Sequence, residues 1–175
     1  MSENAPGHWL FVVRTEDRPG AAADIAVVFS GRGIQIESLI GAGDPLHPGQ
    51  QGEGVISLTF QAFRSRQEMV RRVLQRLEVV RSVEAYDYER DPRLVKTATL
   101  RLTRWDEGVE ESLRQAGVTF HRLDAQVLCL SGGPLEVDRA IRELAGSGVV
   151  TQVTYALLPP PVAPQAGSGE EAAGP

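Results

Sequence analysis

One order of strands and helices is predicted twice along this chain of 175 residues, and that repeat limits the possible folds more than any other feature. In the first copy, a β-branched and aromatic segment at residues 8–15 predicts a strand. After a turn, Ala22, Ile25, Val28 and Phe29 recur at helical spacing. The rest of this copy is expected to comprise strands at residues 34–39 and 55–63, a helix after residue 65 and a strand at residues 79–88.

The second copy repeats this βαββαβ order. Its strands are expected at residues 94–103, 118–123, 125–130 and 149–158, and its helices at residues 106–116 and 134–145. A βαββαβ unit is typical of the ferredoxin-like fold, in which helices cover one face of an antiparallel sheet. The sequence therefore predicts an α+β protein with two ferredoxin-like domains, at residues 8–90 and 93–158.

The segments between these elements carry the expected breakers and caps. Gly33 is expected to end the first helix, and Ser65 with Glu68 forms a predicted capping box for the second. Residues 41–54 are rich in Gly, Pro, Asp and Gln, so we expect a long loop there. Residues 159–175 are mostly Pro, Gly, Ala and Glu, which predicts a disordered tail.

The first strand is apolar on both of its sides. Trp9, Phe11 and Val13 lie on one side, and Leu10 and Val12 lie on the other. Helices cover only one face of a ferredoxin-like sheet, so the second face must meet solvent, another domain or a partner chain. With apolar residues on both sides of the strand, this face is too apolar for water. We expect this second face to be buried against a partner.

Composition excludes several classes of protein. The formal net charge of −5 argues against nucleic-acid binding, because contact with phosphates needs a basic surface. The single cysteine, Cys129, excludes an intramolecular disulfide and indicates a reducing compartment. No apolar run approaches the roughly 20 residues of a membrane span, and residues 1–8 show no secretory signal. We therefore expect a soluble cytoplasmic protein with no nucleic-acid or membrane partner.

Residues with catalytic or metal-binding potential are few. His8, His47 and His121 are the only histidines, and none stands at a catalytic spacing from Ser, Asp or Cys. Cys129 alternates within an apolar strand, which is typical of an inert thiol. His121 and Cys129 offer two metal ligands across neighbouring strands, but without a C-x-x-C or H-x-x-x-H pattern. We predict a chain that is not an enzyme, with no catalytic residue, no metal and no cofactor of its own.

The start of the first helix carries the pattern most typical of a ligand site. Asp17-Arg-Pro-Gly20 ends the strand, and Ala21, Ala22 and Ala23 begin the helix. The first N–H groups of a helix are unpaired and lie at the positive end of its dipole, so they attract a carboxylate. Small side chains let a ligand approach, and Asp17 can accept hydrogen bonds from an ammonium group. The pattern predicts a zwitterionic α-amino acid, although turn geometry alone also explains Asp17 and Gly20.

Residues 16–39, which include E-D-R-P-G and then V-F-S-G-R-G-I-Q-I-E-S-L, resemble the N-terminal ACT domain of acetolactate synthase (acetohydroxyacid synthase) small, regulatory subunits. The likeness is specific in sequence over these residues. Over the rest of the chain it concerns the architecture, since the family also has a second ferredoxin-like domain after the ACT domain. It implies a homodimer whose ACT domains pair edge to edge and bind a branched-chain amino acid (valine, leucine or isoleucine) between them. It also implies a catalytic large subunit as partner, which would hold the thiamine diphosphate, Mg and FAD.

The resemblance implies that Asp17, Gly20, Ala21, Ala22 and Gln35 bind the amino acid. Gly20 matches the family's ligand-facing glycine. Asp17 replaces an asparagine, and Gln35 replaces a second one that reaches across from the neighbouring chain. Asp cannot donate a hydrogen bond and Gln is longer by one methylene, so both departures alter the site. The alternative is a stand-alone ACT-domain sensor, or a degenerate structural dimer without a synthase partner.

Overall fold

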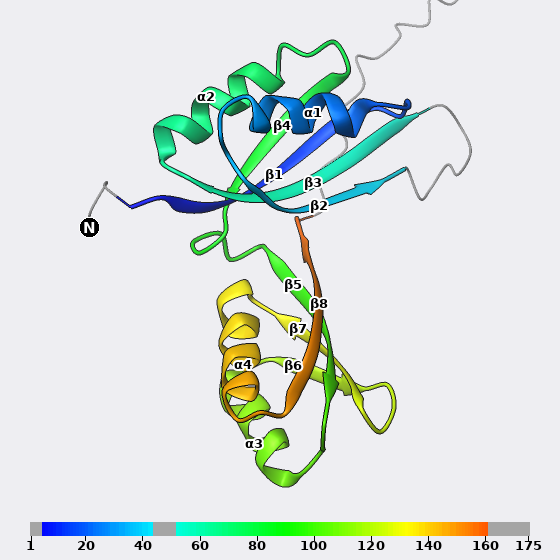
Figure 1. Cartoon of the computed structure of the whole chain (residues 1–175), viewed down its shortest axis with the longest axis vertical. Helices are drawn as coiled ribbons and strands as arrows, with labels where there is room; N and C mark the ends of the chain where they lie inside the picture. The colour runs from blue at the N-terminus through cyan, green and yellow to red at the C-terminus, as the bar shows by residue number, and fades with distance from the viewer. Residues whose placement is uncertain (1–4, 44–51, 161–175) are drawn as a thin grey trace, which may run out of the picture.

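The structure, a computed structural model, describes residues 5–43 and 52–160, which form two units joined by a short connection (Figure 1). The first unit contains β1 (Gly7–Glu16), α1 (Ala21–Ser30), β2 (Ile36–Ala42), β3 (Glu53–Ala62), α2 (Arg64–Leu74) and β4 (Val80–Asp87). The second contains β5 (Val95–Leu102), α3 (Glu107–Ala116), β6 (Thr119–Arg122), β7 (Val127–Gly132), α4 (Pro134–Gly146) and β8 (Val150–Leu158). The predicted βαββαβ order is confirmed in both units.

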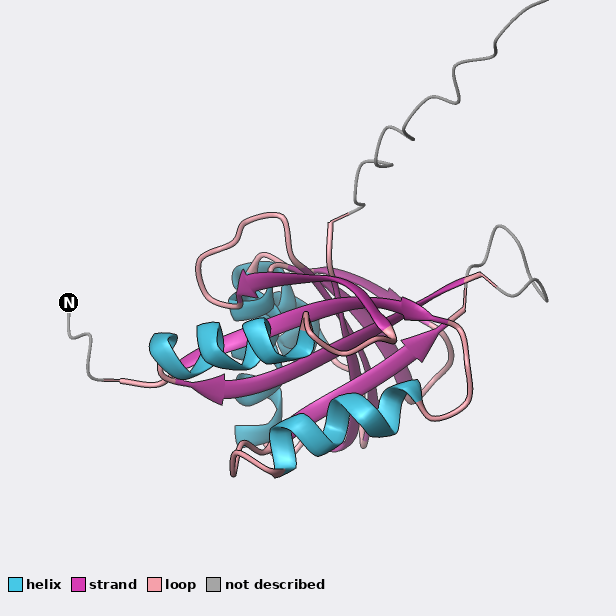
Figure 2. Cartoon of the chain, turned by 90° about the horizontal axis from the view of Figure 1, so that it is seen from above, coloured by secondary structure: helices cyan, strands magenta, loops and turns pink. Residues whose placement is uncertain are grey.

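Each unit is a four-stranded antiparallel sheet with its helices on one face. The strand orders are β2-β3-β1-β4 and β6-β7-β5-β8, so the first strand of each unit is central. Figure 1 shows α1 and α2 on one side of the first sheet, and Figure 2 shows the same helices lying over its strands. The predicted fold class, two ferredoxin-like units, is confirmed.

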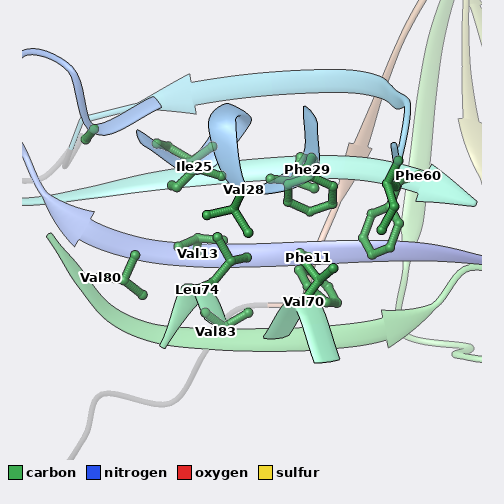
Figure 3. Packing of buried hydrophobic residues seen from close by; sticks show 14 of the residues in the cluster. Phe11, Val13, Ile25, Val28, Phe29, Phe60, Val70, Leu74, Val80 and Val83 are labelled. Carbon is green, nitrogen blue, oxygen red and sulfur yellow. The ribbon is translucent and has the colours of Figure 1, made fainter. Parts of the chain in front are cut away.

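Three phenylalanines form the centre of the first core (Figure 3). Phe11 of β1 and Phe29 of α1 each meet Phe60 of β3 edge to face, with ring centroids 4.8 and 4.9 Å apart. Such pairs contribute about 0.5–1.5 kcal/mol each beyond the burial of their area. Val70 and Leu74 of α2 complete the packing and are fully buried. The helical spacing seen in the sequence thus marks the faces that hold the helices on the sheet.

The ends of the first two helices differ in how well the sequence predicts them. Gly33 adopts a φ of +60°, and the amide after it, that of Ile34, donates to Phe29 O at 3.1 Å, as expected of a glycine that ends a helix. The prediction of a capping box at Ser65 and Glu68 is wrong. The helix α2 begins at Arg64, and its N-cap residue is Phe63, which has no capping side chain. Glu68 instead lies one turn into the helix.

The strands β2 and β3 continue into the segment expected to be a loop. Gly41 pairs with Ile56, and Gly54 pairs with Thr15, so the ladder extends two to three residues further at each end. Glycine lacks a side chain but keeps both backbone hydrogen-bonding groups, so it interrupts a sequence pattern without interrupting a sheet. Residues 44–51 of the predicted loop, and residues 161–175 of the predicted tail, lie outside the described residues.

The second unit covers the apolar back face of the first sheet. Leu10 and Val12 are only 1% and 2% exposed, and they pack with Leu94 and Leu157 from the two ends of the second unit. Tyr86, at the end of β4, belongs to the same cluster. The expectation that another chain buries this face is therefore wrong for its centre, because β8 returns to the first unit (Figure 1).

A buried polar cluster lies beside this apolar contact. Lys96, the only lysine in the chain, is 5% exposed and forms an ion pair with Asp138 of α4. Its Nζ also lies 2.9 Å from the Tyr88 hydroxyl and 4.1 Å from the centre of the Tyr155 ring. Burial and the hydrogen bond to Asp138 raise the pKa of Tyr88, so its hydroxyl stays protonated and donates to Asp138 Oδ2 at 2.8 Å. We call Tyr88, Lys96 and Asp138 the joint, since they connect the two units.

The joint extends into the first unit through a histidine. The His8 ring stacks on the Tyr88 ring, with centroids 3.9 Å apart. On its other side, His8 Nε2 lies 2.6 Å from Glu37 Oε2 of β2. The joint therefore reaches from α4 of the second unit to the edge strand of the first.

Replacing Asp138 by Ala is expected to lower the free energy of unfolding by about 3 kcal/mol, because it leaves the Lys96 ammonium buried without its carboxylate. Adding Lys96→Met to this variant should restore part of the loss, since no charge is then buried. Urea denaturation of the two variants measures both values. A double variant that is less stable than Asp138→Ala would contradict this account of the joint.

Candidate functional site

The predicted ligand site is the corner where β1 passes into α1. β1 ends at Glu16, and the amide of Asp17 donates to Gly52 O at 3.0 Å, which holds the turn against the start of β3. Asp17 Oδ2 lies near Gly43, because a Cβ built on that glycine would be 3.5 Å away. The carboxylate of Asp17 therefore lies at the end of the β2–β3 hairpin, and it is exposed.

Gly20 is the N-cap residue of α1 and adopts a left-handed φ of +91°. Residues with a side chain rarely adopt this conformation, so turn geometry alone requires glycine here. A Cβ on Gly20 would meet no atom within 4 Å, which leaves open space in front of the helix start. The glycine thus provides both the turn and an approach to the backbone.

The amides at the start of α1 are not all available to a ligand. The amide of Ala21 donates to Arg18 O at 3.3 Å, and its side chain is buried. Within residues 5–43 and 52–160, the amides of Ala22 and Ala23 have no acceptor. Ala22 is exposed, so its amide and that of Ala23 are the donors that a carboxylate could use, whereas that of Ala21 serves the turn.

Arg18 is a charged member of this corner in addition to the residues predicted from the sequence. Its Nη2 lies 3.2 Å from Asp24 Oδ2, and both side chains are about half exposed. Asp24 stands in the first turn of α1, so the pair holds a guanidinium beside the helix start. The sequence does hold a signal for this ion pair: a basic residue follows Asp17, and an acidic residue, Asp24, stands in the first turn of the helix.

Gln35 lies at the other end of the first sheet. β1 and β2 run parallel to one another on either side of β3. Trp9 and Ile36 both pair with Phe60, whereas Glu16 pairs with Glu53 at the opposite end of β3. These two levels are seven residues of β3 apart, and Gln35 and Asp17 each lie one residue further out, so at about 3.3 Å per residue they are roughly 30 Å apart in the same chain. The structure therefore brings Asp17, Gly20 and Ala22 together but not Gln35.

The outer edge of β2 is free for another strand. Among the described residues, β2 pairs with β3 on one side only. Leu39 and Ile40 of this strand are 39% and 41% exposed, and they point to opposite faces of the sheet. An unpaired edge with apolar side chains is suited to pairing with a second chain. If two copies pair antiparallel along β2, the start of one β2 lies at the end of the other.

The other candidate residues form no site within the described ranges. His121 and Cys129 do pair directly across β6 and β7, as neighbouring strands would place them. However, in residues 5–43 and 52–160 no three His, Cys, Asp or Glu side chains are close enough together to hold a metal ion. No helix in the part of the chain that the structure describes is long and apolar enough to cross a membrane.

Comparison with known proteins adds to this geometry. No protein-family model matches the chain. The acetolactate synthase small subunit of Mycolicibacterium smegmatis is 25% identical over 159 residues, which cover 86% of this chain and 93% of that protein. The chain is similar to an acetolactate synthase small subunit. The resemblance that residues 16–39 indicate is thus confirmed over most of the chain.

The crystal structure of the acetolactate synthase small subunit from Thermotoga maritima has the same fold. It matches 89% of this chain and 99% of its own length with a TM-score of 0.64, at 16% sequence identity. At this identity the match concerns the fold alone, and it supports two ACT-type ferredoxin-like units in one chain. The likeness to acetolactate synthase small subunits therefore holds in sequence and in fold.

Replacing Gly20 by Ala is expected to lower the free energy of unfolding by about 1 kcal/mol, because an L-residue is strained at a positive φ even where space is open. Gly41→Ala is the matched control, since a Cβ there also meets nothing within 4 Å and its φ is not positive. Urea denaturation measures both variants. Equal stabilities of the two variants would show that the left-handed turn is not maintained in solution.

Proposed function

We propose that this chain is the regulatory subunit of an acetolactate synthase-like enzyme. In this proposal two copies pair along β2, and a branched-chain amino acid (valine, leucine or isoleucine) binds at each corner of the pair. Asp17, Gly20, Ala21 and Ala22 of one copy and Gln35 of the other surround it. The chain activates and feedback-regulates a catalytic subunit that holds thiamine diphosphate, Mg and FAD, and both act in the cytoplasm.

The placement of Gln35 carries this proposal. Gln35 lies at the start of β2, and the corner with Asp17 lies beside the end of β2. Antiparallel pairing of two β2 strands brings these ends together twice, once at each end of the new ladder. A site assembled in this way exists only in the dimer, so binding of the ligand favours one dimer geometry.

The charges at the corner match a zwitterion. Asp17 accepts hydrogen bonds from the α-ammonium, while the free amides of Ala22 and Ala23 lie at the positive end of the α1 dipole and favour the α-carboxylate. Arg18, paired with Asp24 at 3.2 Å, places a guanidinium beside them. The exposed side chain of Leu39, on the helix side of β2, offers apolar contact to a branched side chain.

Arg18 also offsets the exchange of asparagine for Asp17. Asp17 cannot donate to the ligand carboxylate, and losing one hydrogen bond to a charged group, worth about 1.5–3 kcal/mol, weakens binding by about one to two orders of magnitude. The guanidinium of Arg18 has donors to replace that bond. Its place beside the helix start supports the proposal that the chain still binds an amino acid although Asp17 replaces an asparagine.

Regulation follows as a shift in population. A ligand changes the balance of two dimer geometries only by the difference between its affinities for them. Since each site takes residues from both copies, its affinity depends directly on how the copies pair. The catalytic subunit responds to whichever geometry is favoured.

The second candidate function is a stand-alone ACT-domain sensor or a degenerate structural dimer. Asp17 and Gln35 in place of asparagines favour it, because both alter the ligand contacts. Co-purification of the chain with a thiamine-diphosphate enzyme separates the two proposals, since activation does not need an intact amino-acid site. Absence of such an enzyme, together with no heat of binding for valine, leucine or isoleucine, would favour the second.

We expect Gly20→Asp to abolish binding of whichever of the three amino acids binds the wild type, because it places a carboxylate in the space in front of the helix start. Calorimetric titration with valine, leucine and isoleucine measures this. Asp is among the residues that tolerate a left-handed φ, and a side chain at this position meets no atom within 4 Å, so the fold should persist.

Gly20→Ala is the control for this experiment, since it introduces at least as much strain at this φ without the charge. It should bind the amino acid within about threefold of the wild type, a difference of less than 1 kcal/mol. Unchanged affinity in Gly20→Asp would place the amino-acid site elsewhere in the protein.

A further inference from the structure

The outer face of α2 is strongly basic. Residues 64–76 contain five exposed arginines, Arg64, Arg66, Arg71, Arg72 and Arg76, in a chain whose formal net charge is −5. Glu68 is the only acidic residue of this stretch, and it lies 3.5 Å from Arg64 and 3.8 Å from Arg72. Among the described residues, no carboxylate lies within 4.0 Å of the other three. We call these arginines, with Arg32, the arginine patch.

Two large apolar side chains are exposed within the arginine patch. Phe63 and Met69 are 45% and 39% exposed, and with Ser65 and Arg66 they line an open pocket of about 380 Å³. Arg32, at the end of α1, approaches Met69 with its Nε 3.3 Å from Sδ. Met, Phe and Arg are the residues enriched at the centres of protein interfaces.

Helical spacing places arginines on both sides of Met69. Arg66 and Arg72 lie three residues before and after it, so all three share one face of α2. The inward face of the same helix is occupied by Val70 and Leu74, which are fully buried. Met69 is therefore not needed for the core, and it forms an apolar centre with a cationic rim.

The arginine patch stays uncovered by the contacts already described. α2 packs beside β4, the edge strand opposite β2 (Figure 1). The second unit packs on the other face of the sheet, against Leu10 and Val12. The second unit therefore does not cover α2, and the free edge of β2 lies at the side of the sheet opposite β4. The first unit thus has a third surface that is free to bind.

We propose that the arginine patch binds an acidic protein segment, whose carboxylates contact the arginines and whose apolar side chain enters the pocket of Phe63 and Met69. This rests on the proposed function in one respect, namely that the segment belongs to the catalytic subunit. A protein fits better than a nucleic acid, because the centre of the patch is an apolar pocket and the rest of the chain carries an excess of negative charge.

The test measures binding of the purified acetolactate synthase catalytic subunit from the same organism, by titration calorimetry at 150 mM salt. Arg66→Glu with Arg72→Glu should weaken binding about tenfold or more, because each reversal replaces attraction by repulsion. Met69→Ala should weaken it about fivefold, as expected of a central apolar contact, and leave its dependence on salt unchanged. The double reversal should leave the affinity for the amino acid as it is in the wild type.

Arg101→Glu with Arg142→Glu, which reverses two exposed arginines of the second unit, is the matched control and should bind the catalytic subunit within about twofold of the wild type. If the wild type binds and the Arg66/Arg72 variant binds equally well, the arginine patch is not the contact and the proposed function stands. If the wild type does not bind, the proposed function fails. Tighter binding of a 20-bp RNA duplex than of the catalytic subunit would overturn the assignment to a protein partner.

Discussion

The order of strands in the first sheet separates the two halves of the candidate ligand site. β1 and β2 run parallel on either side of β3, so the corner at the end of β1 lies beside the end of β2, and Gln35 lies at its start. No change of rotamer closes a gap of roughly 30 Å, since it exceeds the length of β2, whose seven residues span about 23 Å. A site that uses both ends requires two copies, and the free edge of β2 offers a way to join them. The dependence of ligand binding on assembly is thus a consequence of topology.

The same topology divides the surface of the first unit among three contacts. The β2 edge is free for a second copy, the back face holds the second unit, and the outer face of α2 carries the arginine patch. The joint links two of them, because Glu37 of β2 contacts His8, which stacks on Tyr88 beside Lys96 and Asp138. A buried ion pair with directed hydrogen bonds favours one relative position of the two units. In the proposed dimer, a change at the β2 edge therefore reaches the second unit through few contacts.

The sequence predicts the elements of this fold well because periodicity and breakers report which faces are buried. The helical spacing of Ile25, Val28 and Phe29 and the left-handed Gly33 both have their expected roles in the structure. The capping box at Ser65 does not form, because the N-cap is Phe63, two residues before Ser65, at a boundary that a local pattern defines poorly. The loop expected at residues 41–54 is shorter, because glycines pair within the ladder.

Contacts between distant segments were beyond the sequence analysis. Residue types predicted a helix start suited to a zwitterion. Two further features depend on the folded backbone: the Ala21 amide bonds within the turn, and Arg18 pairs with Asp24. The joint combines a residue that directly follows β4 with residues from β5 and α4, and nothing local marks Lys96 as buried. The contact of the second unit with Leu10 and Val12 could not be predicted for the same reason. The pattern of a strand shows that a face is buried, but not which segment buries it.

Subunit mixing tests most directly whether two copies share the amino-acid site. Gly20→Asp disables the corner and Gln35→Ala disables the residue from the other copy, so each variant alone should bind the amino acid weakly or not at all. When the two variants are co-expressed, half of the dimers are mixed and each mixed dimer regains one intact site. Calorimetry should then find about a quarter of the wild-type number of sites, with wild-type affinity. If the mixture binds no more than its separate components, or if Gln35→Ala alone binds like the wild type, the site is not shared between two copies.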